Sequence, residues 1–382
     1  MLFRNFNGKL KNLNYLLLFA IIGLNAMGTV AIMSTSGISS SLSIKQILGS
    51  TVSIGLCILI SLIDINVILE YDKLIYGIGL AFLIAVKIAG TAYGRVSIRW
   101  IELPFIGQFQ PTEILKLGLI IFFSKFFATY GPGINSREVL FRFFMWYFVP
   151  ILFVLMQPNL STALIITVIV FTMFFVSEIR GRFLVILIAS AVLFFGLVLF
   201  LVKGGGAEKI PFLQPYQIQR ISSFLNPSEN TESQYQQDNS VIAIGSGGLE
   251  GKGVMTDSIF SVKNGDWLVE ERNDFIFAVI GEEVGFRGSI FILAVFLFVI
   301  YSCFVIASTT RGIEEKFICV GVGAWIGFQT FTNIGVATSL LPNTGVPLPF
   351  FSQGLTSLVS VYLGMGIVLG IDADSKIRKA PY

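Results

Sequence analysis

Residues 160–202 read LSTALIITVIVFTMFFVSEIRGRFLVILIASAVLFFGLVLFLV. The stretch contains two apolar runs, 160–177 and 183–202, separated only by the five residues Glu-Ile-Arg-Gly-Arg. A helix needs about 20 mostly apolar residues to cross the hydrocarbon core of a bilayer. Both runs are continuous, whereas the strands of a membrane barrel alternate between apolar and polar residues. The stretch therefore predicts two consecutive transmembrane helices.

Eight further runs of the same kind occur along the chain, at 14–34, 46–66, 72–90, 112–130, 141–157, 287–308, 316–339 and 350–371. The first is too long, and lacks the small-residue cleavage site, to be a removed signal peptide. We predict an all-α polytopic membrane protein with about ten transmembrane helices. One large polar loop, 203–274, interrupts the series between helices 7 and 8, and the simplest partition is a single membrane domain over 1–382.

The composition agrees with a membrane protein and excludes several kinds of site. Hydrophobic residues make up 54% of the chain and charged residues only 13%, against about 25% charged in a soluble domain. The net charge is only +3 and is spread along the chain, without the cluster of basic residues that is typical of a nucleic-acid-binding protein. The chain has no histidine, which excludes a His–Ser or His–zinc mechanism. The three cysteines fall inside apolar runs and are expected to be buried free thiols.

Lysine and arginine in the short loops predict the orientation, because cytoplasmic loops carry the excess of these residues. With a cytoplasmic N-terminus, the inner side holds thirteen of them: Arg4, Lys9, Lys11, Lys73, Arg137, Arg142, Arg180, Arg182, Arg311, Lys316, Lys376, Arg378 and Lys379. The outer short loops hold Lys45, Arg95 and Arg99. We therefore expect both termini to be cytoplasmic and the 203–274 loop to be extracytoplasmic.

Ionisable residues in or beside membrane helices are candidates for function, and a first cluster surrounds the start of the fourth helix. Arg95 and Arg99 precede it, and Glu113 and Lys116 lie in its first turns. Residues three apart share one helical face, so Glu113 and Lys116 are expected to pair. Lys116 meeting an anionic lipid head group is the open alternative.

A second cluster lies at 157–163. A capped tight turn explains it without any function, since Pro158 ends one helix and Asn159 caps the next. A third contains Asp274, directly before an apolar helix, and Glu282 and Glu283 within it. Asp274 is either an N-cap or a chemical group. The two glutamates need a cationic or hydrogen-bonding partner, for which Lys116 or Arg99 could serve.

A fourth cluster, 342–357, combines three prolines with polar residues that include Ser352 and Thr356. It predicts a bent or re-entrant segment whose backbone is satisfied by protein or by a wet cavity. The Gly-rich stretch 245–253, with Lys252, resembles an anion-cradling turn but lacks phosphate-loop spacing. All four clusters map to the outer side, where they would suit an amphiphile with a phosphate head group.

Five ordered motifs also resemble a known family: QPTEILK (110–116), QPNLSTAL (157–164), GSGGLEGKG (245–253), NDFIFAVIGEEVGFRG (273–288) and NTGVPLPFFSQGLTSL (343–358). They are similar to the SEDS family (shape, elongation, division, sporulation), the RodA, FtsW and SpoVE group. The resemblance covers essentially the whole chain. It implies ten helices, cytoplasmic termini and a large extracellular loop between helices 7 and 8.

The resemblance further implies a peptidoglycan glycosyltransferase in the bacterial cytoplasmic membrane that polymerises lipid II, an undecaprenyl-pyrophosphate-linked disaccharide-peptide. Its usual partner would be a class B penicillin-binding transpeptidase. The essential aspartate of the family falls on Asp274. A carboxylate there would accept the proton of the attacking sugar hydroxyl, and Arg99, Lys116 and Lys252 are candidates to stabilise the departing pyrophosphate. Glu113, Glu282, Glu283, Ser352 and Thr356 complete the expected substrate-binding set. The need for a divalent cation is left open.

The chain departs from the family pattern at Asn159 and Ser161, where QPDLG is usual, and at 352–357, where SYGGSS is usual. PExHTDF is also common in the family, where this chain has VEERNDF at 269–275. Two alternatives follow. Intramembrane Glu282, Glu283 and Lys116 would suit a lipid II transporter, and the departures would suit a weakly active scaffold for the transpeptidase.

Overall fold

The computed structural model of the chain describes residues 6–90, 99–103, 107–157, 159–203, 215–225, 232–256, 261 and 272–379. Each predicted apolar run coincides with a helix. These helices are α2 (Tyr15–Ser36), α3 (Ser41–Ser61), α5 (Asp72–Ala89), α6 (Pro111–Tyr130), α7 (Arg137–Met156), α8 (Leu160–Val176), α9 (Gly181–Lys203), α12 (Ile276–Thr309), α13 (Ile313–Ala337) and α14 (Leu355–Lys379). The all-α prediction is confirmed.

Within the described part of the chain, seven helices are long and apolar enough to cross a membrane, judged by length and composition: α2, α3, α6, α7, α12, α13 and α14. Helix α8 has 17 residues and falls short of that length. The chain is a multi-pass membrane protein, and the number of ten spans stays a prediction.

Short elements that the hydropathy pattern did not predict complete the fold. They are α1 (Phe6–Asn12), α4 (Ile65–Glu70), η1 (Gly131–Asn135), α10 (Pro215–Leu225), α11 (Glu232–Ser246), and the antiparallel strands β1 (Ile101–Leu103) and β2 (Gly107–Phe109). Helices α10 and α11 lie within 203–274, so part of the polar loop is helical. These segments are too short or too polar to produce a membrane-spanning signal.

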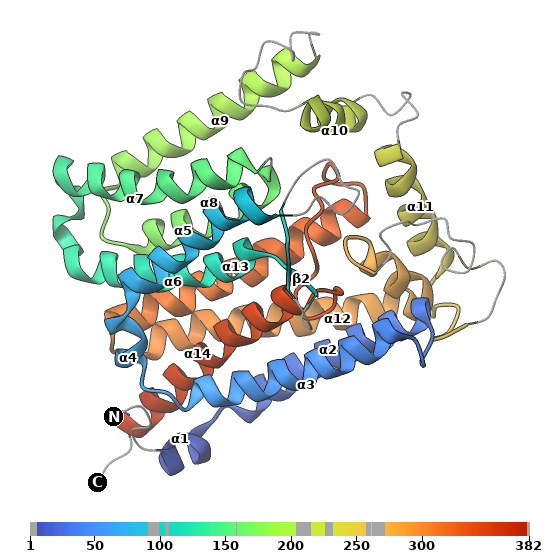
Figure 1. Ribbon diagram of the computed structural model, residues 1–382, viewed down its shortest axis with the longest axis horizontal. Coiled ribbons are helices and arrows are strands. Elements are labelled where there is room, and N and C mark those ends of the chain that lie inside the picture. The colour runs from blue at the N-terminus through green and yellow to red at the C-terminus, as the bar shows by residue number, and fades with distance from the viewer. Residues whose placement is uncertain are drawn as a thin grey trace.

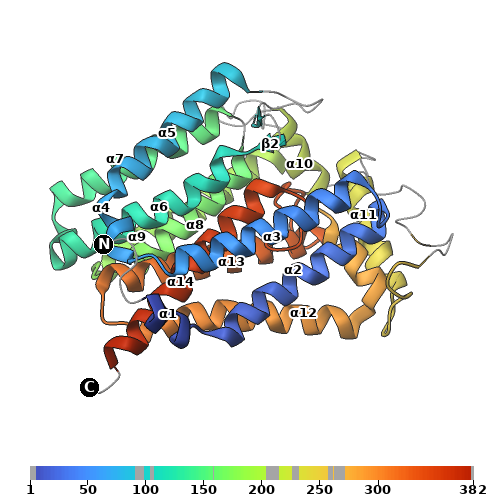
Figure 2. The same cartoon turned by 60° about the horizontal axis from the view of Figure 1, so that its bottom comes forward.

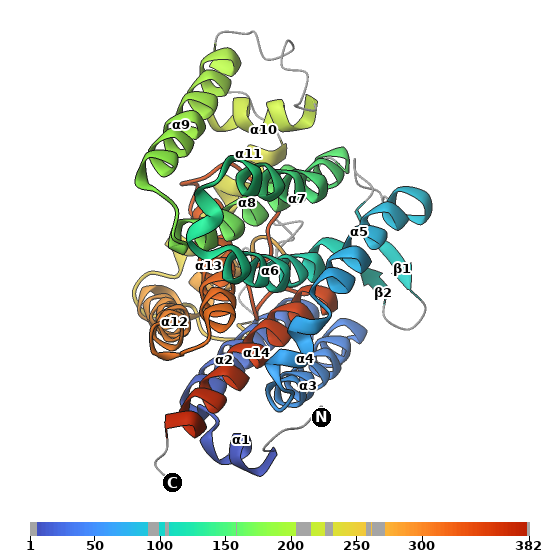
Figure 3. The same cartoon turned by 90° about the vertical axis from the view of Figure 1, so that its left-hand side faces the viewer.

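Helix α13 lies at the centre of the bundle and packs against α6, α8 and α12, while α14 packs along α3. Seen along the helices, α9 and α10 lie together at one edge, apart from α2, α3 and α14 (Figure 3). Aromatic side chains fill the contact between α6, α7 and α8, where the rings of Phe143 and Phe174 stack with centroids 4.5 Å apart. Dispersion between such well-packed groups drives helix association in lipid, because lipid tails are themselves apolar.

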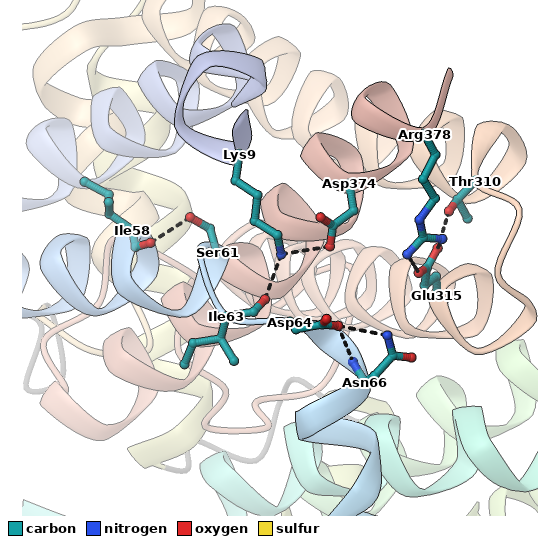
Figure 4. A network of polar contacts seen from close by, with 10 residues as sticks. All are labelled: Lys9, Ile58, Ser61, Ile63, Asp64, Asn66, Thr310, Glu315, Asp374 and Arg378. Atoms are coloured by element: carbon teal, nitrogen blue, oxygen red, sulfur yellow. Dashed lines mark hydrogen bonds and ion pairs between the residues drawn. The ribbon is translucent and has the colours of Figure 1, made fainter. Parts of the chain in front are cut away.

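Both termini lie at one end of the bundle and α11 lies at the other (Figures 1 and 2). Ion pairs fasten the helices at the terminal end (Figure 4). Lys9 of α1 is buried, lies 2.8 Å from Asp374 of α14, and donates a hydrogen bond to the Ile63 carbonyl after α3. Arg378 of α14 lies 2.9 Å from Glu315 of α13. These ion pairs occupy one end of α13 and α14, and the candidate site lies at the opposite ends of the two helices.

Candidate functional site

Asp274 lies directly before α12, whose N-cap position is occupied by Phe275. The N-cap interpretation of Asp274 is therefore wrong. Its carboxylate lies instead against the backbone of Gly345, in the segment between α13 and α14. A Cβ atom built on Gly345 would lie 3.2 Å from Asp274 Oδ2 and 3.8 Å from Arg220 Nη1. Gly345 has a φ of +68°, a left-handed conformation that glycine adopts without strain.

Arg220 comes to this site from α10, in the polar loop. Its guanidinium donates a 3.1 Å hydrogen bond to the carbonyl of Asn343, two residues before Gly345. Arg220 was not predicted from the sequence, because it is one of six basic residues in the 203–274 loop. A usable signal was its position in an amphipathic segment, PYQIQRISSFL, which predicts a helix at a membrane interface.

Lys116 and Glu113 form the ion pair expected from their spacing, with Nζ and Oε1 2.8 Å apart. Lys116 Nζ also donates to Gln329 Oε1 at 2.9 Å and lies 4.9 Å from the centroid of the Trp325 ring. Trp325 Nε1 donates to the same Gln329 oxygen at 2.7 Å. Helix α13 thus supplies two partners that stabilise the buried lysine besides its glutamate.

Gln329 connects this buried pair to the segment that faces Asp274. Its Nε2 donates a 2.9 Å hydrogen bond to the Pro347 carbonyl. Asn333, one turn further along α13, donates to the carbonyls of Asp274 and Val346. Neither residue was predicted to belong to the site. Their i,i+4 spacing in an otherwise apolar helix is the signal that could have found them.

The hydroxyls of Ser352 and Thr356 bind the protein's own backbone. Ser352 Oγ donates to the Asn273 carbonyl and accepts from the Leu348 N–H, both at 2.7 Å. Thr356 Oγ1 donates to the Gln108 carbonyl and accepts from the Gln110 N–H, both at 3.3 Å. Ser352 therefore fastens the Asp274 segment, and Thr356 fastens the end of the β1–β2 hairpin to α14.

The two departures in the second cluster also reach the site. Asn159 caps α8, its side chain accepting from the Thr162 N–H, as predicted. Ser161 Oγ donates to the carbonyl of Thr344. Among the residues that the structure describes, no hydrogen-bond partner reaches three buried atoms: Nδ2 of Asn159 and the side-chain oxygens of Asn343 and Thr344. Groups of this kind are available to a bound polar ligand.

A second group forms around Lys252, Glu282 and Glu283. Lys252 Nζ lies 2.6 Å from Glu282 Oε1, and its backbone N–H binds the Glu282 carbonyl. Glu283 accepts from the Ser34 hydroxyl and from the Met255 N–H. Lys252, and not Lys116 or Arg99 as predicted, is the cation paired with Glu282, because the Gly-rich turn packs directly onto α12.

The close packing of the Gly-rich turn on α12 requires a glycine in each of these two segments. Gly285 breaks the helical geometry of α12 with a φ of +64°, and a Cβ on it would lie 2.3 Å from the Gly251 nitrogen. The turn at 245–253 therefore fills a break in α12. Its resemblance to an anion cradle is explained here by this close backbone contact.

The remaining predicted residues lie around the hairpin. Arg99 is half-buried and lies two residues before β1, and Arg95 lies outside the described residues. Within the described ranges no group of three or more His, Cys, Asp or Glu side chains is arranged to hold a metal ion. The structure thus brings Glu113, Lys116, Asp274, Ser352 and Arg220 around the 342–354 segment, with Lys252, Glu282 and Glu283 forming a separate group on α12.

Comparisons with known proteins agree with this architecture. A family model of the FtsW, RodA and SpoVE type, described as "Cell cycle protein", matches residues 12–377. A probable peptidoglycan glycosyltransferase FtsW from Wigglesworthia glossinidia brevipalpis is 32% identical over 95% of this chain and 94% of its own length. A protein of the same name from Enterococcus hirae is 32% identical over 96% of this chain and 93% of its own length.

Two solved structures have the same fold. A chain from a peptidoglycan synthase complex, described as coordinating polymerization and crosslinking, superposes with a TM-score of 0.77 and 26% identity, over 95% of this chain and 98% of that one. The rod shape determining protein RodA of Thermus thermophilus superposes with a TM-score of 0.68 and 24% identity, over 95% of this chain and 97% of that one. The second likeness concerns the fold alone.

Proposed function

The chain belongs to the SEDS family, the group of FtsW, RodA and SpoVE, and we propose that it is a peptidoglycan glycosyltransferase that polymerises lipid II. The observation that carries this proposal is that the Asp274 carboxylate and the Arg220 guanidinium both lie beside Gly345. A general base and a cation at one place are the two groups that glycosyl transfer from a pyrophosphate donor needs.

The proposed reaction joins two sugars at the Asp274 carboxylate. The 4-hydroxyl of one disaccharide attacks the anomeric carbon of the other, and the bond from that carbon to the pyrophosphate oxygen breaks. Asp274 accepts the hydroxyl proton as the new glycosidic bond forms. Undecaprenyl pyrophosphate leaves with the bonding electron pair.

Cationic side chains stabilise the pyrophosphate as it leaves. We assign this role first to Arg220, because its guanidinium lies beside Gly345, the residue that the Asp274 carboxylate also faces. Arg99 remains a proposed contributor from the hairpin side. The charges of Lys116 and Lys252 are each paired with a buried carboxylate. We therefore propose that the two lysines act on the substrate indirectly, by maintaining the shape and the electrostatic field of the site.

The proposed setting follows from the same chemistry. The site would face the outside of the bacterial cytoplasmic membrane, with both termini cytoplasmic, and the lipid chain of the substrate would lie among the helices. A class B penicillin-binding transpeptidase is the proposed partner, because a polymerised strand needs crosslinking. The supporting observation is the likeness to a chain of a synthase complex that couples both reactions.

Polymerisation of lipid II by purified protein in detergent or vesicles tests the proposal. Asp274→Asn keeps the shape of the side chain and removes its basicity, so glycan product is expected to fall by about 10²–10⁴-fold. Glu250→Gln is the matched control, since Glu250 is an exposed acidic residue of the same loop that pairs with Arg287. Undiminished polymerisation in Asp274→Asn contradicts the assignment, and movement of lipid II across vesicles without polymerisation would support a transporter.

A further inference from the structure

Three successive backbone carbonyls hold the Asp274 segment in place. The Arg272 carbonyl accepts from the Gln353 N–H at 2.9 Å. The Asn273 carbonyl accepts from Ser352 Oγ at 2.7 Å, and the Asp274 carbonyl accepts from Asn333 Nδ2 at 2.8 Å. Hydrogen bonds on three consecutive peptide units leave the backbone that carries the carboxylate little freedom to rotate.

Asn333 differs from the other two donors because it belongs to neither of the segments that it connects. Gln353 and Ser352 lie in the 342–354 segment itself, whereas Asn333 lies on α13. Its Nδ2 donates to the Asp274 carbonyl and to the Val346 carbonyl, each at 2.8 Å. Val346 follows Gly345, the residue against which the Asp274 carboxylate lies. One buried amide group on α13 therefore holds both segments, in addition to the two hydrogen bonds that join them directly.

The amide is well suited to this task. Asn333 is 1% exposed and lies on α13, a helix packed on several sides by the bundle. An NH₂ group supplies two donors, one for each carbonyl. In a site shielded from water these bonds are stronger than at a surface, and an unmade one is costly.

We propose that Asn333 is a positioning residue that fixes the Asp274 carboxylate relative to the 342–354 segment for the transfer reaction. The inference rests on the proposed function of Asp274. It assigns to Asn333 no contact with substrate: the residue acts through the two carbonyls it holds. Misplacement of a catalytic group by about 1 Å can cost on the order of 100-fold in rate, so the expected effect falls on kcat.

Two substitutions separate positioning from packing. Asn333→Leu is nearly isosteric and removes the donor, whereas Asn333→Gln keeps the donor but adds a methylene to a tightly packed site. Positioning predicts that kcat falls about 100-fold in Asn333→Leu, with KM for lipid II within about two-fold, and that Asn333→Gln retains more activity than Asn333→Leu. A packing role predicts the reverse order.

Asn25→Leu is the matched control. Asn25 is also a buried membrane asparagine, and its Nδ2 donates to the Phe350 carbonyl in the same 342–354 segment, at 2.9 Å. We expect Asn25→Leu to lower the thermal midpoint as Asn333→Leu does while leaving kcat within about two-fold of wild type. Hydrogen exchange at the amides of 273–278 should rise in Asn333→Leu only.

Each result is decisive. Wild-type kcat in Asn333→Leu, or higher activity in Asn333→Leu than in Asn333→Gln, overturns the inference and leaves the role of Asp274 intact. Equal loss of kcat in Asn25→Leu overturns it too, because the effect would then follow from general loosening of the segment. A wild-type protein that forms no glycan, alone or with its partner, overturns the proposed function and this inference with it.

Discussion

Lys116 and Glu113 form an ion pair of 2.8 Å in which the two side chains are only 1% and 3% exposed. Two charges so far from water stabilise each other, and Gln329 and Trp325 also contact the lysine. A substrate head group could enter this part of the site only by competing with these contacts.

We predict that Lys116→Met destabilises the protein by about 3–5 kcal/mol, because it leaves the Glu113 carboxylate buried and uncompensated. Glu113→Gln combined with Lys116→Met should recover most of that loss. Thermal unfolding in detergent measures both. A double variant as unstable as Lys116→Met alone would show that the pair is not the source of the stability.

Replacing Lys252 is expected to loosen the break in α12. The Lys252 side chain is 22% exposed and that of Glu282 only 1%, so Lys252→Met should cost about 1–3 kcal/mol because the buried glutamate loses its ion-pair partner. Arg287→Met breaks an ion pair whose side chains are 71% and 78% exposed and should cost less than about 1 kcal/mol. Equal thermal midpoints for the two variants would contradict this difference.

Gly345→Ala should lower polymerisation, because the new methyl group would meet Asp274 Oδ2 at 3.2 Å. The left-handed φ adds a backbone cost of about 1–2 kcal/mol. Gly37→Ala is the control: Gly37 also has a positive φ, of +86°, but open space where a Cβ would be. We expect both variants to lose stability and only Gly345→Ala to lose kcat, measured with lipid II.

Arg220→Met should weaken use of lipid II by roughly 10–100-fold in kcat/KM, since a charge-assisted contact contributes about 1.5–3 kcal/mol. Arg220→Lys should restore part of the loss, because it keeps the charge but not the planar fork. Arg142→Met, which breaks an ion pair with Glu138 on α7, should change nothing in the same assay. Full activity in Arg220→Met would remove Arg220 from the proposed mechanism.

Several features of the site could be predicted from local sequence. The Glu113–Lys116 pair followed from helical spacing, and the capping role of Asn159 from its place before an apolar run. The partner of Glu282 was predicted wrongly, because the Gly-rich turn reaches α12 through a contact between glycines that hydropathy does not encode. Arg220, Gln329 and Asn333 were missed for a related reason: their importance comes from what they touch across the fold.

The apolar run at 160–202 was a reliable guide because its information is local. Whether about twenty consecutive residues are apolar enough to cross a bilayer as a helix depends on those residues alone. This property was enough to predict a multi-pass helical membrane protein interrupted by a polar loop. Only the tertiary structure decided what the polar residues do, since a buried hydrogen bond depends on groups distant in the chain. Asn333 and Gly345 contact Asp274, and Arg220 reaches the same segment, because the loop helix α10, the centre of the bundle and the 342–354 segment converge there.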